Sequence, residues 1–300
     1  MTAISIILPT YNRAGTIARP IESVRAQNFK DFELIVVDDG SSDDTHERVA
    51  SYSDPRIVFL RQDTNMGGNA ARNRGISEAR GDIVCFIDSD DAFLPHKLNY
   101  LNDYFGAHPG TDVLVDSFQI LYPPSMSKKP KQRINPVIEN SADLELAIFA
   151  RHLYKATPAL SARRDALIAV GLFDESLKRR QDMDLLLRLV RQMTCASTDA
   201  VLWTKYWSED AISSKLDTFV DATLEICQRH PDYRRQPAFR AGLSRDVARH
   251  AVRLARRGDW STLRVDFGRL VSHFGAVDTA RLLLRGLVEI GKRRKLPGQD

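Results

Sequence analysis

The chain has 300 residues, and 43% of them are hydrophobic. This length allows one large domain with an appendage, and this composition excludes a disordered, collagen-like or disulfide-rich protein. Its net charge of +4 is uneven, because residues 215–300 hold 18 Lys and Arg against 10 Asp and Glu, whereas residues 1–214 have a net charge of −4. Three scattered cysteines without a CxxC pair favour neither a zinc site nor a disulfide framework and fit a reducing compartment.

Short apolar strands alternate with helical patterns through the first half of the chain. The expected strands are Ile4–Leu8, Glu33–Val37, Arg56–Leu60, Ile83–Ile87 and Val113–Val115. The expected helices are Ile17–Gln27, Asp44–Ser53, Asn69–Ala79 and Lys97–Ala107. This alternation predicts an α/β fold with a mostly parallel sheet and helices on both faces. In such sheets ligands bind outside the carboxyl ends of the strands.

The second half of the chain has weaker patterns. Residues 117–140 contain Pro123-Pro124, Pro130 and several lysines and predict an irregular loop. Residues 141–190 have a helical pattern, interrupted near Thr157-Pro158 by a short segment with the character of a strand. From about residue 215 the pattern is wholly helical, so we expect a C-terminal helical region that is also basic.

An acidic cluster, Asp88-Ser89-Asp90, follows the apolar run Ile83–Ile87. Hard cations such as Mg²⁺ or Mn²⁺ bind one or two carboxylates together with phosphate oxygens of a substrate. Taken alone, the motif is equally an acidic turn that caps the helix beginning near Pro95. Its position on the edge that the other loops share favours a cation site.

Two further groups belong to the same edge. Asp38 and Asp39 follow the second strand, where a carboxylate can accept hydrogen bonds from a nucleobase or ribose; an Asp-Gly turn is the alternative. Arg72 stands near the start of a helix, and a guanidinium beside a helix N-terminus can hold an anion; a surface arginine is the alternative.

Asp182 and Asp184 precede the apolar helix that contains Leu185–Leu189. An aspartate at a helix start is commonly an N-cap. The functional interpretation makes one of these carboxylates the general base that takes a proton from an acceptor hydroxyl.

The order and spacing of these motifs resemble glycosyltransferase family 2, which has the GT-A fold, over about residues 3–213. The resemblance depends on the segments 6–13 (IILPTYNR), 36–43 (VVDDGSSD), 65–75 (NMGGNAARNRG), 79–91 (ARGDIVCFIDSDD), 171–177 (GLFDESL) and 181–185 (QDMDL). It implies a Rossmann-like sheet flanked by helices.

The resemblance also implies roles for individual positions. Asp182 is the implied catalytic base, and Asp90 the implied ligand of a divalent metal, Mn²⁺ or Mg²⁺. The nucleotide-sugar-binding positions are Pro9, Tyr11, Arg13, Asp38, Asp39, Arg72, Asp88 and Ser89. In related enzymes a Tyr-x-x-His supplies a further metal ligand, and here Tyr206-Trp207-Ser208-Glu209 places Glu209 where that histidine is expected.

The expected activity is inverting transfer of a sugar from a nucleotide diphosphate, with a UDP-sugar favoured, to the hydroxyl of a saccharide or lipid-linked saccharide in glycan synthesis. A non-catalytic carbohydrate-binding relative and a nucleotidyltransferase of similar fold are the alternatives. We expect a GT-A catalytic domain over residues 1–214, with a donor half to about 115 and an acceptor half beyond it. A helical region then covers 215–300. No nucleic-acid partner is expected.

No apolar stretch approaches the ~18 residues of a membrane-spanning helix, and the N-terminus has the pattern of a strand rather than a signal peptide. We therefore expect a cytoplasmic protein, soluble or peripheral at the inner face of the cell membrane. Residues 281–295 alternate leucines and basic residues, including Lys292–Lys295, and predict contact with an anionic lipid surface; a helix packed on the catalytic domain is the alternative.

Overall fold

The computed structural model describes residues 3–208 and 218–291, apart from the side chains of Glu289 and Gly291. The described residues form two compact units. The first contains residues 3–144 and 154–208, and the second contains residues 145–153 and 218–291. The expected boundary at residue 214 lies outside the described residues and stays a prediction.

One sheet organises the first unit. In the part of the chain that the structure describes it has nine strands in the order β3-β2-β1-β4-β8-β6-β9-β5, with β7 paired to β6. The first four strands are parallel to one another. They are β1 (Ile4–Thr10), β2 (Phe32–Asp38), β3 (Ile57–Arg61) and β4 (Ile83–Phe86), which confirms the four expected there. Strands β1, β2 and β4 are buried along their whole length, as expected for strands covered on both faces.

The other half of the sheet mixes directions. Strand β8 (Leu160–Arg163) is antiparallel to both β4 and β6 (Val113–Leu121), whereas β6 and β9 (Cys195–Tyr206) are parallel. The two-residue strand β5 (Ala92–Phe93) pairs with the far end of β9. The strand-like character near Thr157-Pro158 is confirmed by β8, which begins two residues later.

The expected irregular loop over residues 117–140 is wrong in part. Strand β6 continues to Leu121, and β7 (Lys131–Arg133) pairs with it, so the loop is shorter than expected. The prolines of this stretch do not prevent this because all of them lie outside both strands.

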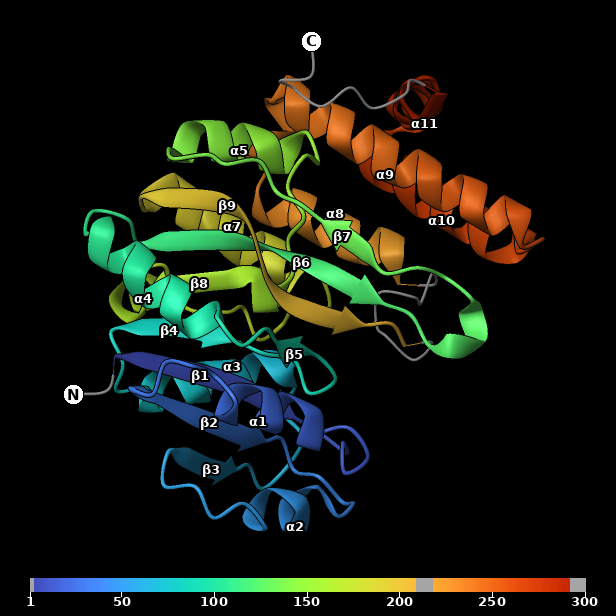
Figure 1. Cartoon of the computed structure of the whole chain (residues 1–300). Coiled ribbons are helices and arrows are strands. Elements are labelled where there is room, and N and C mark those ends of the chain that lie inside the picture. The colour runs from blue at the N-terminus through green and yellow to red at the C-terminus, as the bar shows by residue number, and fades with distance from the viewer. Residues whose placement is uncertain (1–2, 209–217, 292–300) are drawn as a thin grey trace. The chain divides into compact units, whose positions relative to one another are not determined.

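Helices cover both faces of the sheet. Figure 1 shows α1 (Ala18–Arg25) and α4 (Lys97–Ala107) on one face and α3 (Gly68–Glu78) and α7 (Gln181–Gln192) on the other. Connections between parallel strands of a sheet are right-handed. The chain moves across the sheet from β1 through β2 to β3 and then returns past β1 to β4, so the helices of the outward and the return connections lie on opposite faces. The remaining helices of this unit are α2 (Thr45–Ala50), α6 (Arg164–Ala169) and the short turns η1 (Pro124–Met126) and η2 (Thr157–Ala159). Helix α5 (Ser141–Phe149) begins in this unit and ends in the second.

The second unit is helical, as expected. Its elements from residue 218 on are α8 (Phe219–Arg229), η4 (Asp232–Arg235), α9 (Pro237–Arg256), α10 (Trp260–Phe274) and α11 (Ala276–Gly291). Phe149 packs edge-on against Tyr233 and Phe239, so the segment 145–153 belongs to this core. No described helix is long and apolar enough to cross a membrane.

Candidate active site

The carboxyl ends of the parallel strands meet at one edge of the sheet. Thr10 at the end of β1 lies opposite Asp38 at the end of β2, and Asp38 lies opposite Arg61 at the end of β3. Strand β1 has β2 on one side and β4 on the other, so the chain changes direction across it. Ligands of doubly wound sheets bind at such a point.

Asp38 and Asp39 are both buried and hold the loops at this edge. Asp38 accepts a hydrogen bond from the amide of Ser41 at 3.1 Å and lies 3.5 Å from Nε of Arg61. Asp39 accepts from the side-chain amide of Gln62 and from the amides of Met66 and Gly67. These bonds fix the loop that leads into α3. That Asp38 and Asp39 bind a nucleobase stays a prediction.

The loop after β1 is fixed to the loop after β2 by backbone contacts. The amide of Asn12 donates to Ser41 Oγ at 2.8 Å, and the amide of Arg13 donates to Thr45 Oγ1 at 2.8 Å. Pro9 is buried, whereas the Tyr11 side chain is 44% exposed and Arg13 is also exposed. Tyr11 therefore offers a ring on which a base can stack.

Arg72 is buried in the first turns of α3, whose N-terminus follows Gly67 at a φ of 96°. Its Nη2 donates to Asp88 Oδ1 at 2.9 Å, and its Nη1 donates to Asn69 Oδ1 at 3.4 Å. The structure thus brings two of the expected donor-binding residues, Arg72 and Asp88, into direct contact.

The loop after β4 gathers three carboxylates. Burial and the charge of Asp88 raise the pKa of Asp90. Burial and the charges of Asp88 and Asp90 raise the pKa of Asp91 to about 8. Oδ1 of Asp91 accepts from the amide of Tyr206 at 3.1 Å, and its buried Oδ2 has no hydrogen-bond partner among the described residues. Ser89, between Asp88 and Asp90 in the chain, is partly exposed. The loop therefore crowds negative charge that a cation would stabilise.

Two basic residues beside this loop were missed by sequence reasoning. Arg19 on α1 donates to the carbonyl of Asp90 at 2.8 Å and lies over the ring of Tyr206. Lys205 on β9 lowers the pKa values of Asp90 and Asp91 through its charge. The sequence had no periodic signal for β9, so nothing placed Lys205 at the edge.

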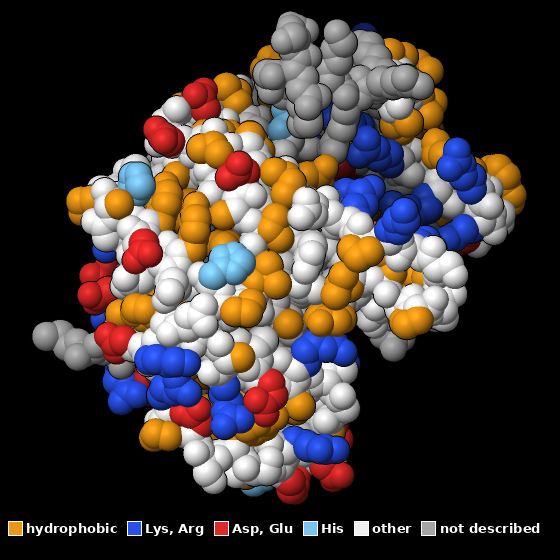
Figure 2. Space-filling model, viewed as in Figure 1, with side chains coloured by type: hydrophobic (Ala, Val, Ile, Leu, Met, Phe, Trp, Pro, Cys, Tyr) orange, Lys and Arg blue, Asp and Glu red, His pale blue; other side chains and the backbone are white. Residues whose placement is uncertain are grey.

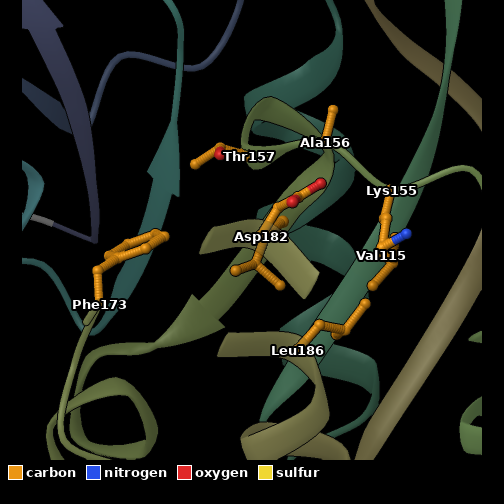
Figure 3. Close-up of a pocket in the computed structure, with 8 residues that line it drawn as sticks. Val115, Lys155, Ala156, Thr157, Phe173, Asp182 and Leu186 are labelled. Atoms are coloured by element: carbon orange, nitrogen blue, oxygen red, sulfur yellow. The ribbon is translucent and has the colours of Figure 1, made fainter. Parts of the chain in front are cut away.

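Asp182 lies in a pocket of the first unit. The pocket is lined by Val115, Lys155, Ala156, Thr157, Leu160, Phe173, Asp182 and Leu186. Figure 3 shows the Asp182 carboxylate pointing toward the segment that contains Ala156 and Thr157, with Phe173 on one side and Lys155 with Val115 on the other. Oδ1 accepts from the amide of Met183 at 2.9 Å, as is common in a first helical turn.

The two aspartates at the start of α7 have different surroundings. Asp184 is buried and forms an ion pair with Arg188 at 2.7 Å, so it stabilises the helix. Asp182 is partly exposed and adds its charge to those of Asp88, Asp90 and Asp91 in raising the pKa of Lys205. The acidic loop and Asp182 therefore face a common region.

The carboxylates fit a metal that is held mainly by its substrate. No group of three or more potential ligands forms a cage among the described residues. The unpartnered oxygen of Asp91 and the crowding of Asp88 and Asp90 still suit a hard cation bound by one or two carboxylates and phosphate oxygens. Glu209, the expected further ligand, lies outside the described residues.

Comparisons with known proteins place the chain in a family of glycosyltransferases. Residues 5–166, more than half of the chain, match the family model described as Glycosyl transferase family 2. An uncharacterized glycosyltransferase of Rickettsia typhi is 31% identical over 63% of this chain and 58% of its own length. The amylovoran biosynthesis glycosyltransferase AmsB of Erwinia amylovora is 31% identical over 61% of this chain and 62% of its own length. The chain thus matches only about three fifths of the length of these relatives.

A further relative and a solved structure extend the comparison. The GalNAc(5)-diNAcBac-PP-undecaprenol beta-1,3-glucosyltransferase of Campylobacter jejuni is 42% identical over 34% of each chain. The crystal structure of S. aureus TarS 1-349 in complex with UDP-GlcNAc has a TM-score of 0.61 at 22% identity, and covers 88% of this chain and 90% of that one. This likeness confirms the expected fold class, a GT-A fold followed by C-terminal helices.

Proposed function

Because the chain belongs to glycosyl transferase family 2, we propose that it transfers a sugar from a nucleoside-diphosphate donor to an acceptor hydroxyl, with inversion at the anomeric carbon. The position of Asp182 supports this most directly. Its carboxylate lines a pocket, and its charge acts on the same lysine, Lys205, as the acidic loop does. The candidate proton acceptor, Asp182, and the candidate diphosphate site at the acidic loop thus both lie near Lys205.

The donor would bind along the edge formed by β1, β2 and β4. Tyr11 offers an exposed ring for the base, and Asp38 and Asp39 keep the adjoining loops in place. Arg72, held by Asp88 at the start of α3, places a guanidinium and helix amides where a diphosphate would lie.

Transfer would take place in one displacement. The acceptor oxygen forms a bond to the anomeric carbon as the bond from that carbon to the diphosphate oxygen breaks, and the electron pair leaves with the diphosphate. Asp182 takes the acceptor's proton on a carboxylate oxygen, the role of a general base. The carboxylate is partly exposed and accepts a hydrogen bond from the amide of Met183, so it has lone pairs left for a hydroxyl.

Asp90, with Asp88, would hold a divalent metal, Mn²⁺ or Mg²⁺. When bound, the metal would supply positive charge for the departing diphosphate. The raised pKa of Asp90 supports this assignment, because a carboxylate crowded by burial and by Asp88 gains from a neighbouring cation.

We propose a UDP-sugar as donor and a lipid-linked saccharide as acceptor. The first agrees with the UDP-GlcNAc complex of TarS, and the second with the undecaprenol-linked substrate in the name of the Campylobacter relative. We place this reaction at the inner face of the cell membrane. The exposed apolar and basic surface of α11, treated in the Discussion, supports such a location.

The test is release of nucleoside diphosphate from a panel of sugar nucleotides with Mn²⁺, followed by an acceptor screen. Asp182→Asn should bind donor as the wild type does but transfer sugar ~10²–10⁴-fold more slowly. Asp184→Asn, which alters the ion pair with Arg188 at the same helix start, is the matched control. If Asp182→Asn loses donor binding and turnover together, Asp182 is a structural helix residue. A chain that binds saccharide but releases no diphosphate would be a non-catalytic relative, and one that releases pyrophosphate a nucleotidyltransferase.

A further inference from the structure

Lys205 is fixed beside the acidic loop by the backbone on either side of it. Thr204, the residue before it in β9, pairs with Ala92 of β5. The amide of Tyr206, the residue after it, donates to Asp91 Oδ1 at 3.1 Å. The backbone of Lys205 is therefore held at this edge of the sheet.

The ammonium lies in the field of four carboxylates. Burial lowers the pKa of Lys205, but these carboxylates together raise it above its usual value. They belong to Asp88, Asp90, Asp91 and Asp182. Across the described ranges, 3–208 and 218–291, no carboxylate oxygen lies within 4.0 Å of Lys205 Nζ. The lysine is charged and forms none of these ion pairs directly.

We propose that Lys205 is the chain's own cation for the donor diphosphate, with its ammonium binding a phosphate oxygen between the acidic loop and Asp182. This rests on the proposed function. The charged carboxylates of this loop would repel a diphosphate, and a metal that neutralises them has less positive charge left for the phosphates. A lysine ammonium is a compact point charge that binds phosphate. Its place on a strand means that little reorganisation is needed when the diphosphate binds.

A purely structural lysine would behave differently. If Lys205 only balances the acidic loop, its removal should affect the stability of the protein and leave unchanged the contribution of the phosphates to nucleotide binding. The ratio of the dissociation constants for uridine and UDP measures that contribution, because the two ligands differ only in the diphosphate.

The experiment is isothermal titration calorimetry of the full chain with UDP and uridine, and with GDP and dTDP as further nucleoside diphosphates, in EDTA and in Mn²⁺. In EDTA, Lys205→Met should reduce the preference for UDP over uridine about 10-fold or more, the weight of one charged hydrogen bond. Lys205→Arg should restore most of it. Lys131→Met, which removes an exposed lysine on β7, should leave it unchanged. Mn²⁺ should bind Lys205→Met more tightly than wild type in electron paramagnetic resonance, because a competing cation is gone.

Each outcome has a definite meaning. If Lys205→Met and wild type have the same UDP-to-uridine preference, the role of Lys205 is overturned while the proposed function stands. If Lys205→Met does not fold, Lys205→Gln takes its place: a folded Lys205→Gln with the UDP-to-uridine preference of the wild type overturns the role of Lys205, and a reduced preference supports it. If the wild type binds none of UDP, GDP and dTDP, the proposed function itself fails.

Discussion

Arg72 Nη2 donates to Asp88 Oδ1 at 2.9 Å, and the arginine side chain is 9% exposed whereas the aspartate is 31% exposed. The guanidinium carbon also lies 5.7 Å from the centroid of the Phe173 ring. The contact joins the start of α3 to the loop after β4, two segments 16 residues apart in the chain. It therefore fixes a positive charge at the edge where we propose that the diphosphate binds.

Arg72→Lys should weaken donor binding by about 10-fold, because an ammonium cannot contact Asp88, Asn69 and a phosphate in the geometry of a planar fork. Calorimetry with the preferred nucleoside diphosphate measures this. Arg74→Lys is the matched control, since Arg74 is an exposed arginine on the same helix. Equal affinities for wild type and Arg72→Lys would place the diphosphate elsewhere.

The strength of the local pattern decided how much of the fold could be predicted. Strands β1, β2 and β4 are mainly apolar runs, each followed by a polar turn that is acidic after β2 and β4, so both their positions and their shared edge followed from the sequence. Strand β9 was missed because its burial does not alternate, and β5 because it has only two residues.

The candidate site divides in the same way. Asp90 and Asp182 stand in recognisable motifs, and in the structure the charges of both act on Lys205. Lys205 acquires its place through the pairing of β9 with β6 and with β5, and the second pairing joins residues more than 100 positions apart. The distinction between Asp182 and Asp184 also needed the structure, because it depends on which carboxylate meets Arg188.

Asp54 holds the end of α1 and the start of β3 together in the first unit. Its carboxylate accepts from Arg56 Nη2 at 2.7 Å and from Arg25 Nε at 3.3 Å. The hydrogen bond from Arg56 holds the pKa of Asp54 far below its usual 3.8, although burial opposes this. A carboxyl with a depressed pKa stabilises the fold above about pH 3.8, and the stabilisation is lost as the pH falls below that value.

Asp54→Asn should therefore lower the free energy of unfolding by about 1–3 kcal/mol at pH 7, and by less as the pH falls below about 4. Urea denaturation at several pH values measures the loss of unfolding free energy at pH 7 and its decrease toward low pH. Asp63→Asn removes an exposed carboxylate and should change little at any pH. A difference between wild type and Asp54→Asn that grows toward low pH would contradict the assigned direction.

Lys97 and Asp116 form an ion pair in which neither side chain is exposed. Lys97 Nζ lies 2.5 Å from Asp116 Oδ2 and donates to the carbonyl of Pro158 at 3.0 Å. The pair thereby joins α4 and β6 to the turn that lines the Asp182 pocket. Burial raises the pKa of Asp116 to about 7, although the charge of Lys97 opposes this.

Lys97→Met should destabilise the protein by about 3–5 kcal/mol, because it leaves a buried carboxylate without its partner. The loss should be larger at pH 8 than at pH 5, since protonation at lower pH removes the buried charge. The double variant Lys97→Met/Asp116→Leu should regain most of the stability. Chemical denaturation of the three proteins decides this, and a double variant as unstable as Lys97→Met would mean that packing rather than charge is responsible.

Helix α11 exposes apolar side chains on the face opposite its contact with α9. Gly286 lies so close to Ser244 of α9 that an added Cβ would be 2.0 Å from the Ser244 carbonyl oxygen. On the other side Val277, Leu284 and Val288 are 61–65% exposed, at spacings that place them on one stripe. Arg281 and Arg285 are also exposed, and the basic Lys292–Lys295 lie outside the described residues. Figure 2 shows Lys and Arg side chains gathered beside hydrophobic ones over the C-terminal helices.

We expect this stripe to bind an anionic lipid surface, with the apolar side chains entering the interface and each nearby arginine adding about 1 kcal/mol. Co-sedimentation with phosphatidylglycerol-containing and with neutral phosphatidylcholine vesicles should show binding to the anionic vesicles alone, and that binding should weaken as salt rises. Leu284→Asp and the double variant Arg281→Ser/Arg285→Ser should each reduce it. Val137→Asp, at an equally exposed apolar position of the first unit, is the control. If neutral and anionic vesicles sediment equal amounts of protein at low salt, the charge of α11 has no part in localisation. If the stripe instead binds a second copy of the protein, sedimentation velocity would show a dimer.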